Sequence, residues 1–177
     1  PLIGAESGNR RWMLMAGPLA MAHFALAAIA FACLAVAFMT DDFSVAIVAS
    51  GSNSLLPEQY KFSAIWGGHE GSMLLWELVL AAWTATVAGF SSSLPRDMRA
   101  RVLSVLGLVS IGLLLFILLT SNPFERMYPN VPAEGRDLNP LLQDIGLVLH
   151  PPMLYLGYVG FSVAFAFAIA ALLSGHL

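Results

Sequence analysis

One histidine stands where a stiff backbone could hold a metal ligand. His150 is followed directly by Pro151 and Pro152. A residue before proline is pushed away from helical backbone angles, so the pattern predicts a break in the backbone at His150. A neutral imidazole is a common ligand of metals, haem iron among them. The same side chain at a helix end could instead cap backbone carbonyls, and the residues alone leave both roles open.

Three other residues could contribute to a binding site. His69 could contact a ligand or a partner protein, or it could order its own turn together with Glu70. Arg136 could bind a carboxylate through two parallel hydrogen bonds, or it could pair with Glu134. Trp66 could stack beside a planar ligand, although an anchor at the membrane interface is the simpler interpretation. These residues are therefore weaker candidates than His150.

Two ionisable residues fall inside apolar runs. Ionisable groups within membrane spans are rare, and His23 and Glu77 could act as relay groups of a transporter or ion pathway. The structural interpretations are a neutral histidine bonded to a neighbouring helix and a glutamate that either reaches toward water or bonds another helix, and we favour them. The single cysteine, Cys33, allows no internal disulfide. The chain also lacks a C-x-x-C-H motif, so it carries no covalently attached c-type haem.

The elements that hold these residues are predicted to be membrane helices. Of the 177 residues, 58% are hydrophobic and 11% are charged, against about 25% charged in a soluble domain. A helix needs about 20 apolar residues to cross a bilayer, and in lipid only helices or closed barrels satisfy their backbone groups. We predict an all-α, polytopic membrane bundle, a single domain over 1–177, with spans at about 13–38, 72–90, 102–120 and 153–173. No basic tract suggests a nucleic-acid partner.

The arginines predict which side each loop faces. Cytoplasmic loops of membrane proteins collect Lys and Arg. The segments before the first span and between the second and third spans hold five arginines: Arg10, Arg11, Arg96, Arg99 and Arg101. The long loops 40–71 and 121–152 are net acidic. We therefore expect these two loops on the outer, periplasmic side and both chain ends on the cytoplasmic side.

Both outer loops are predicted to be ordered. Asn139 can cap a helix and Pro140 suits its first turn, and apolar residues at helical spacing follow through Leu149. This helix is expected to lie on the membrane surface, to end at His150, and to be followed by a span that begins at Pro152. In the other loop, residues 43–49 are rich in β-forming types.

Two stretches carry a resemblance to a known family. One is WGGHEGSMLLW at 66–76, and the other is EGRDLNPLLQD at 134–144, which continues into GLVLHPPMLYLGY. Together they resemble the CcmF family of cytochrome c biogenesis proteins, which includes the NrfE branch. The resemblance is strong from about Asp42 onward and weaker before it.

The resemblance implies a multi-pass protein of the bacterial cytoplasmic (inner) membrane and part of a haem lyase complex. Such proteins take haem from a periplasmic haem chaperone and help attach it to apocytochrome c. Thiol-reducing maturation subunits keep the cysteines of the apocytochrome reduced. Their haem, b-type and non-covalent, lies against a tryptophan-rich outer segment between two histidines. His150 matches the first of these histidines and would be an axial ligand of the iron, with His69, Arg136 and Trp66 as weaker cofactor contacts. The family also carries a b-type haem within the membrane, whose ligands lie further along the chain.

The sequence departs from the family pattern in one large respect. The tryptophan-rich haem segment and the second histidine do not occur in these 177 residues and would follow Leu177. We therefore expect the chain to be the N-terminal portion of a longer protein, and not a competent lyase alone. His23 and Glu77 match no family motif. Two rival functions remain: a transporter or ion-pathway subunit, and a scaffold of the maturation complex that binds no haem.

Overall fold

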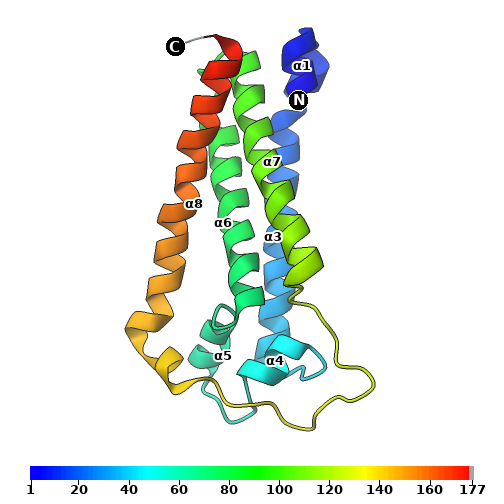
Figure 1. The fold of residues 1–177 in the computed structure, drawn as a ribbon, viewed down its shortest axis with the longest axis vertical. Helices are drawn as coiled ribbons and strands as arrows, with labels where there is room; N and C mark the ends of the chain where they lie inside the picture. Colours follow the sequence, from blue (N-terminus) through cyan, green and yellow to red (C-terminus); the bar gives the residue numbers. More distant parts are fainter. Residues whose placement is uncertain (176–177) are drawn as a thin grey trace. The chain divides into compact units, whose positions relative to one another are not determined.

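The computed structural model describes residues 1–175, and most of them are helical (Figure 1). The elements in chain order are α1 Leu2–Ser7, α2 Arg10–Leu14, α3 Ala16–Met39, α4 Ala46–Gly51, α5 Glu58–Ala64, α6 His69–Phe90, α7 Arg96–Thr120, the 3₁₀ helix η1 Pro140–Gln143, and α8 Ile145–Ser174. Within the described residues the β contacts are limited to one isolated bridge, between Val45 and Arg126. The predicted all-α class is confirmed.

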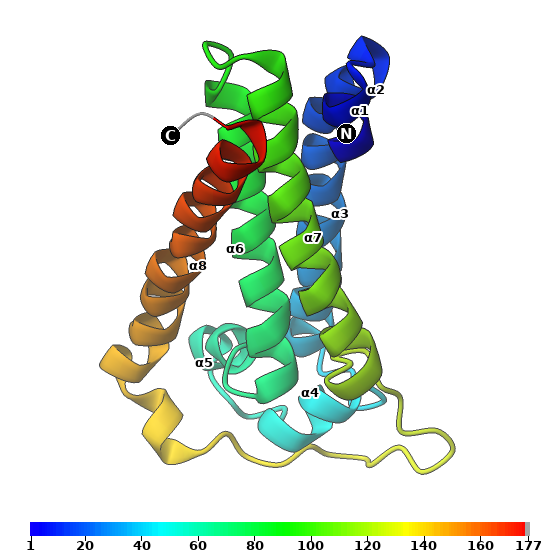
Figure 2. The same cartoon turned by 45° about the horizontal axis from the view of Figure 1, so that its top comes forward.

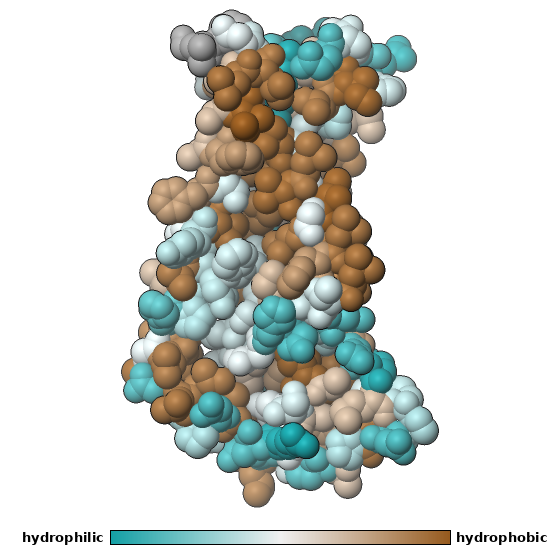
Figure 3. Space-filling model, in the orientation of Figure 1, coloured by the Kyte–Doolittle hydropathy of each residue, from teal (hydrophilic) through white to brown (hydrophobic). Residues whose placement is uncertain are grey.

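Four helical stretches are long and apolar enough to cross a membrane. They are Arg10–Met39, His69–Phe90, Arg96–Thr120 and Ile145–Ser174. The prediction of a polytopic membrane protein with four spans is therefore confirmed. Only 17% of the most apolar window of the first and of the last stretch is buried, so most of these apolar side chains lie on the outside. In Figure 3 brown, apolar side chains gather along α7 and over the upper part of α8.

The chain divides into two compact units that share the long helices. Unit 1 contains residues 1–27, 77–114 and those from 156 onward, and unit 2 contains residues 28–76 and 115–155. Charge is distributed unevenly between them. Unit 1 holds five arginines and three acidic residues, whereas unit 2 holds three basic and eight acidic residues. The acidic loops therefore belong to one unit and the arginine-dense segments to the other.

Small residues and arginines hold unit 1 together. Ala16, Ala20, Ala88 and Leu103 form a core cluster, and their small side chains let helices approach closely. The guanidinium of Arg99 donates a hydrogen bond to the carbonyl of Ala88, one of the last carbonyls of α6 that no helical N–H reaches. Arg101 pairs with Asp97 at 2.9 Å and with Glu6 of α1 at 3.1 Å.

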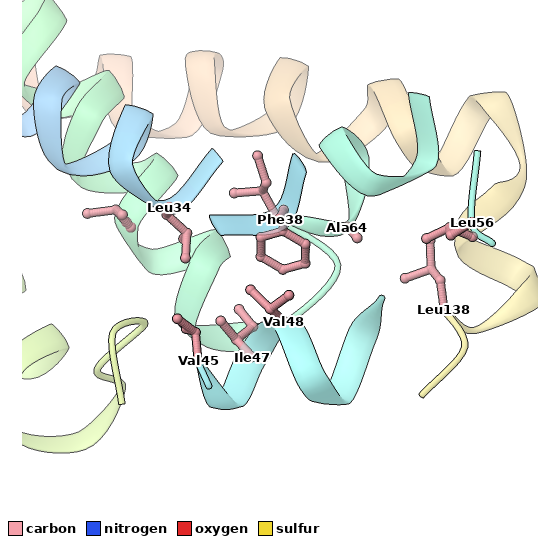
Figure 4. Packing of buried hydrophobic residues seen from close by; sticks show 10 residues of the cluster. Leu34, Phe38, Val45, Ile47, Val48, Leu56, Ala64 and Leu138 are labelled. Atoms are coloured by element: carbon pink, nitrogen blue, oxygen red, sulfur yellow. The ribbon is translucent and has the colours of Figure 1, made fainter. Parts of the chain in front are cut away.

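Unit 2 is built around a hydrophobic cluster that its loops cover. Phe38 of α3 is fully buried, and Figure 4 shows its ring beside Val48 of α4. Leu56 and Leu138 pack against each other in the same cluster, and they bring together segments far apart in the sequence (Figure 4). The extended segment 121–139 runs along α4 in both Figure 1 and Figure 2. Its backbone is bonded there, because Arg136 N–H donates to the Ala49 carbonyl at 2.8 Å.

Two glycines of unit 2 permit backbone contacts that a side chain would prevent. A Cβ on Gly71 would lie 1.6 Å from the Ile65 carbonyl oxygen, and a Cβ on Gly135 would lie 2.0 Å from the Ser52 carbonyl oxygen. Both glycines belong to the stretches that carry the family resemblance. The lack of a side chain at Gly71 allows the tight turn before α6, and the lack of one at Gly135 allows segment 121–139 to pack closely against the end of α4.

The predicted break at His150 is wrong. The helix predicted from Pro140 to Leu149 is divided in the structure. Its first part is the short turn η1, which Asn139 caps through a 3.1 Å bond from Leu141 N–H, and residues 145–149 belong to α8. The last span then starts at Ile145, not Pro152, and α8 continues through His150, Pro151 and Pro152. Prolines within membrane helices are tolerated where neighbouring groups bond the carbonyls that they leave free.

The β-rich stretch at 43–49 also takes a different form. Residues 46–51 form the helix α4, and only Val45 makes a bridge. Strand formation requires a continuous partner, and the segment around Arg126 offers one only briefly, through Met127 N–H to the Ser44 carbonyl at 2.9 Å. Burial of Ile47 and Val48 in the core favours the helix.

We expect Phe38→Ala to destabilise unit 2 by about 3–5 kcal/mol, because it removes a buried ring and leaves a cavity. The free energy of unfolding in detergent micelles, followed by denaturant titration, measures the effect. Leu55→Ala is the control, since Leu55 is 92% exposed and its truncation should change stability by less than about 0.5 kcal/mol. Equal effects of the two variants would contradict the assigned core.

Candidate functional site

The imidazole of His150 lies on the surface of unit 2 without a hydrogen-bond partner. The residue is exposed, and no hydrogen bond or ion pair within residues 1–175 involves its ring. It sits in the body of α8, so it does not cap a helix end. Its ring nitrogens are therefore free to bind a metal or a donor group.

The surface around His150 is apolar. Leu147, Leu149, Met153 and Leu154 are exposed large hydrophobic residues in the same part of α8. A porphyrin is a flat apolar ring that needs an axial ligand and apolar contacts, and haem pockets supply both. A free imidazole among exposed apolar side chains fits that requirement for one face of a haem. No group of three or more His, Cys, Asp or Glu within 1–175 could hold a metal ion by itself.

The first turn of α8 is capped by Asp144, a role that the sequence analysis did not assign. The Asp144 carboxylate accepts hydrogen bonds from Gly146 N–H at 2.8 Å and from Leu147 N–H at 3.4 Å. Asp is among the preferred residues at this position. The signal was therefore in the sequence, since Asp144 stands directly before the apolar run that forms α8.

Trp66 is partly buried in unit 2 and uses its indole nitrogen inside the protein. Its Nε1–H donates to the backbone carbonyl of Val148 at 3.0 Å. Its ring meets the ring of Phe62 edge-on, with 5.4 Å between centroids. The indole therefore bonds α8 through its nitrogen, and its ring packs against the hydrophobic cluster around Phe38.

His69 joins two segments of unit 2. The residue begins α6, and its Nδ1 lies 3.0 Å from the hydroxyl of Ser121, just after α7. Its ring also meets Phe116 edge-on at 5.9 Å. The structure gives no bond between His69 and Glu70 within the described residues. Instead, the imidazole contacts Ser121 and Phe116, which are far from it in the sequence. No hydrogen bond or ring contact within the described chain connects His69 with His150.

Arg136 presents an unpaired guanidinium. The residue is exposed, and within residues 1–175 its side chain makes no ion pair or hydrogen bond. The alternative pairing with Glu134 is wrong, because the Glu134 carboxylate accepts hydrogen bonds from Ser54 N–H at 2.9 Å and from the Ser54 hydroxyl at 2.6 Å. Arg136 remains available to a carboxylate or another anion.

Two carboxylates hold the outer loops together. The hydroxyl of Ser54 lowers the pKa of Glu134 below its ordinary value. The hydroxyl of Ser44 lowers the pKa of Asp42 most strongly, and Arg126, which bonds Asp42 at 2.9 Å, adds to the effect against the opposing cost of burial. Asp42 connects segment 121–139 to the loop after α3, and Glu134 connects it to the loop after α4, so the ionised forms stabilise the packing of the loops around α4.

Unit 1 contains a polar cluster that the sequence interpretation did not assemble. His23 Nε2 lies 2.6 Å from Oε1 of Glu77, and the hydroxyl of Ser110 bonds the same oxygen. The Glu77 side chain is 1% exposed and that of His23 is 25% exposed. Residues 54 and 33 positions apart meet here, on three different helices. The structural interpretations of His23 and of Glu77 as side chains bonded to neighbouring helices match this arrangement, whereas the alternative in which Glu77 reaches water does not.

The cluster is isolated from other ionisable groups along the spans of unit 1. The stretches 13–27, 78–90, 102–114 and 156–174 contain no Asp, Glu, Lys or Arg and no second His. His23 and Ser110 line a pocket of about 550 Å³ whose other walls are mainly apolar. An ion pathway requires a continuous series of polar groups or water-lined walls. This cluster therefore resembles a polar joint between helices more than a pathway.

Comparison with known proteins identifies similar sequences. The family model described as Cytochrome C assembly protein matches residues 66–177, more than half of the chain. The chain is 65% identical over all 177 residues to the cytochrome c-type biogenesis protein CcmF of Pseudomonas fluorescens, 58% identical to CcmF of Escherichia coli K12, and 47% identical over 173 residues to NrfE of Haemophilus influenzae. These matches include all or nearly all of this chain, which spans 27% of the length of each relative. No solved structure matches.

We expect His23→Leu to destabilise unit 1 by about 1–3 kcal/mol, because it leaves the buried Glu77 carboxylate with Ser110 as its remaining partner. The double variant His23→Leu/Glu77→Leu should recover part of this loss, since it removes both polar groups together. Thermal unfolding in micelles measures both variants. Additive losses in the double variant would show that the two side chains do not interact.

The contact between Glu134 and Ser54 should weaken in acid. Because the folded-state pKa of Glu134 is lowered, its stabilising effect is complete above the ordinary pKa and is lost as the pH falls through the lowered value. We expect the stability difference between the parent chain and Glu134→Gln to shrink over that acidic range. Glu58→Gln, at an exposed carboxylate that makes no hydrogen bond in the described chain, is the control. A difference that does not vary with pH would contradict the assignment.

Proposed function

The chain belongs to the Cytochrome C assembly protein family, and we propose that it forms part of a membrane protein that presents haem to apocytochrome c, with His150 as an axial ligand. The observation that supports this role most directly is the free, exposed imidazole of His150 among apolar side chains. It also occupies the position that the family resemblance implies for a haem ligand. Because the chain covers 27% of the relatives' length, the second ligand and the rest of the site are expected outside it.

The charge distribution supports an orientation for this protein. In our proposal the arginine-dense ends of unit 1 face the cytoplasm, and the acidic loops of unit 2 face the periplasm across the inner membrane. His150 belongs to unit 2, so it would lie on the periplasmic side. This is the side on which a periplasmic haem chaperone could deliver haem and on which apocytochrome c could receive it.

The chain's own residues would hold the substrate and would not carry out bond formation themselves. His150 would bind the iron, and the unpaired guanidinium of Arg136 could bind a propionate carboxylate. When bound, haem supplies the vinyl groups with which the cysteines react. Each cysteine thiol adds its sulfur and its hydrogen across one vinyl double bond, so a thioether forms without an external oxidant. The contribution of His150 would be orientation, which can lower a barrier by several kcal/mol, on the order of 7–11 in well-oriented cases.

Other parts of the maturation machinery are implied by this proposal. The thiols of the apocytochrome must be reduced, which requires thiol-reducing maturation subunits. The iron must be ferrous for thioether formation, which requires an electron donor. Membrane lipid surrounds the exposed apolar side chains of the long helices. These partners are consistent with the family but are identified only by the chemistry that the reaction needs.

The rival functions are less well supported. The span segments around the His23–Glu77 cluster contain no other Asp, Glu, Lys, Arg or His, and the pocket beside His23 is mainly apolar, which disfavours an ion pathway through unit 1. A scaffold without haem would not need a free imidazole among apolar side chains. The identities to the two CcmF relatives named above exceed that to NrfE, which favours the CcmF branch.

We expect His150→Ala to abolish or greatly reduce haem binding on the outer side and the yield of cytochrome c. The test uses a full-length chimera, in which this chain replaces the matching 177 residues of the Pseudomonas fluorescens relative. Haem content is measured from the absorbance of the purified chimera, and cytochrome c yield from covalently bound haem in cells. Leu55→Ala is the control, because it truncates an exposed apolar residue of unit 2 that lies outside α8 and outside the surface around His150. Unchanged haem content and cytochrome yield in His150→Ala would remove the assignment.

A further inference from the structure

The helix that carries His150 contains two prolines in succession. Pro151 and Pro152 lie inside α8, where each residue normally donates its N–H to the carbonyl four residues earlier. Proline has no N–H, so the carbonyls of Leu147 and Val148 lose their ordinary donors. An interior proline costs a helix about 3 kcal/mol or more. This stretch therefore needs support from outside the helix if His150 is to be held in one position.

Trp66 supplies the donor that Pro152 lacks. Its Nε1–H lies 3.0 Å from the carbonyl oxygen of Val148, the oxygen that residue 152 would otherwise bond. The indole is itself held in place. Its ring packs edge-on against Phe62, and its own backbone N–H donates to the Ser63 carbonyl at 3.2 Å.

A second contact lies on the other side of the prolines. The hydroxyl of Tyr155 donates to the Ser72 hydroxyl at 3.2 Å, and the Ser72 hydroxyl donates to the carbonyl of Trp66 at 2.8 Å. The ring of Tyr155 also meets that of Trp76 edge-on at 5.5 Å. The segment 66–76 thus contacts α8 both before and after the prolines, at Val148 and at Tyr155.

We propose that Trp66 is a positioning residue for His150: its indole N–H replaces the backbone hydrogen bond that Pro152 removes and so fixes the imidazole two residues from Val148. The inference rests on the proposed function of His150 and gives Trp66 a role different from stacking beside haem. Gly71 contributes to it, because its close approach to the Ile65 carbonyl sets the turn that carries Trp66. The donor is then in place before any ligand binds.

The chain offers a matched comparison on the same helix. Trp83 of unit 1 also donates its Nε1–H to a carbonyl of α8, that of Leu156, at 3.2 Å. Residue 160, which would bond this carbonyl in the helix, is a glycine and has its N–H. The Trp83 bond is therefore an additional one, whereas the Trp66 bond substitutes for a missing one. The two tryptophans should respond differently to the same substitution.

The experiment compares Trp66→Phe, Trp83→Phe, Pro152→Ala and the double variant Trp66→Phe/Pro152→Ala in the full-length chimera. Phenylalanine keeps an aromatic ring and removes the N–H, and Pro152→Ala restores a backbone donor for Val148. The readout is the carbon monoxide affinity of the reduced haem, since a loosely held axial histidine is displaced more easily. Loss of one hydrogen bond, that between Trp66 and Val148, should change the carbon monoxide affinity by about two- to tenfold.

We expect Trp66→Phe to raise the carbon monoxide affinity and Trp83→Phe to leave it unchanged. The double variant should return to the value of Pro152→Ala, because the restored backbone bond makes the indole donor unnecessary. A Trp66→Phe effect that Pro152→Ala does not reverse would overturn the inference, and so would equal effects of the two tryptophan variants.

A second measurement separates this inference from the proposed function. Hydrogen exchange of backbone amides around His150 in the haem-free chimera should be faster in Trp66→Phe and should be restored in the double variant. If His150→Ala leaves haem binding intact, the proposed function fails while the exchange result still decides the role of Trp66. If His150→Ala abolishes haem binding but Trp66→Phe changes neither carbon monoxide affinity nor exchange, the positioning role fails alone.

Discussion

The requirement that every backbone polar group find a partner away from water determines how unit 2 is built. An unsatisfied carbonyl in an apolar setting costs free energy comparable to a lost hydrogen bond, and two consecutive prolines create two such carbonyls in α8. The helix persists where a neighbouring segment provides a donor, as Trp66 does for Val148. The segment 66–76 and the start of α8 are therefore structurally dependent on each other, which explains why the two stretches that carry the family resemblance occur together.

Close backbone contacts also hold the irregular segments of unit 2 in one conformation. Gly71 and Gly135 lie where a side chain would collide with another segment's carbonyl, and Leu138 enters the core beside Leu56. Segment 121–139 has little regular secondary structure, yet its carboxylates and backbone groups bond the loop after α3, α4 and the loop that follows it. A loop fixed by such contacts can position a side chain, because ordering it has already cost its conformational entropy during folding.

The sequence predicted the number of spans because membrane helices are specified by composition and length, which are local properties. It failed at His150, Pro151 and Pro152 because the rule for residues before proline describes an isolated backbone, whereas the donor that sustains α8 comes from Trp66, 82 residues away. The His23–Glu77 bond was missed for a similar reason, since no local pattern joins residues on different helices. Asp144 is a different case: its capping role was readable from the sequence, but the helix was assigned to the wrong start. The haem role of His150 and the weaker roles of His69 and Arg136 remain predictions.

The two histidines at His23 and His150 are in opposite situations, and the contrast bears on which of them could be a ligand. The ring of His23 is bonded through Nε2 to a nearly fully buried carboxylate, and breaking that bond would leave Glu77 with fewer partners in an apolar surrounding. The ring of His150 makes no hydrogen bond within the described chain, so binding a metal there breaks no bond between these residues. For this reason our proposal assigns the metal-binding role to His150 of α8 and a structural role to the cluster in unit 1.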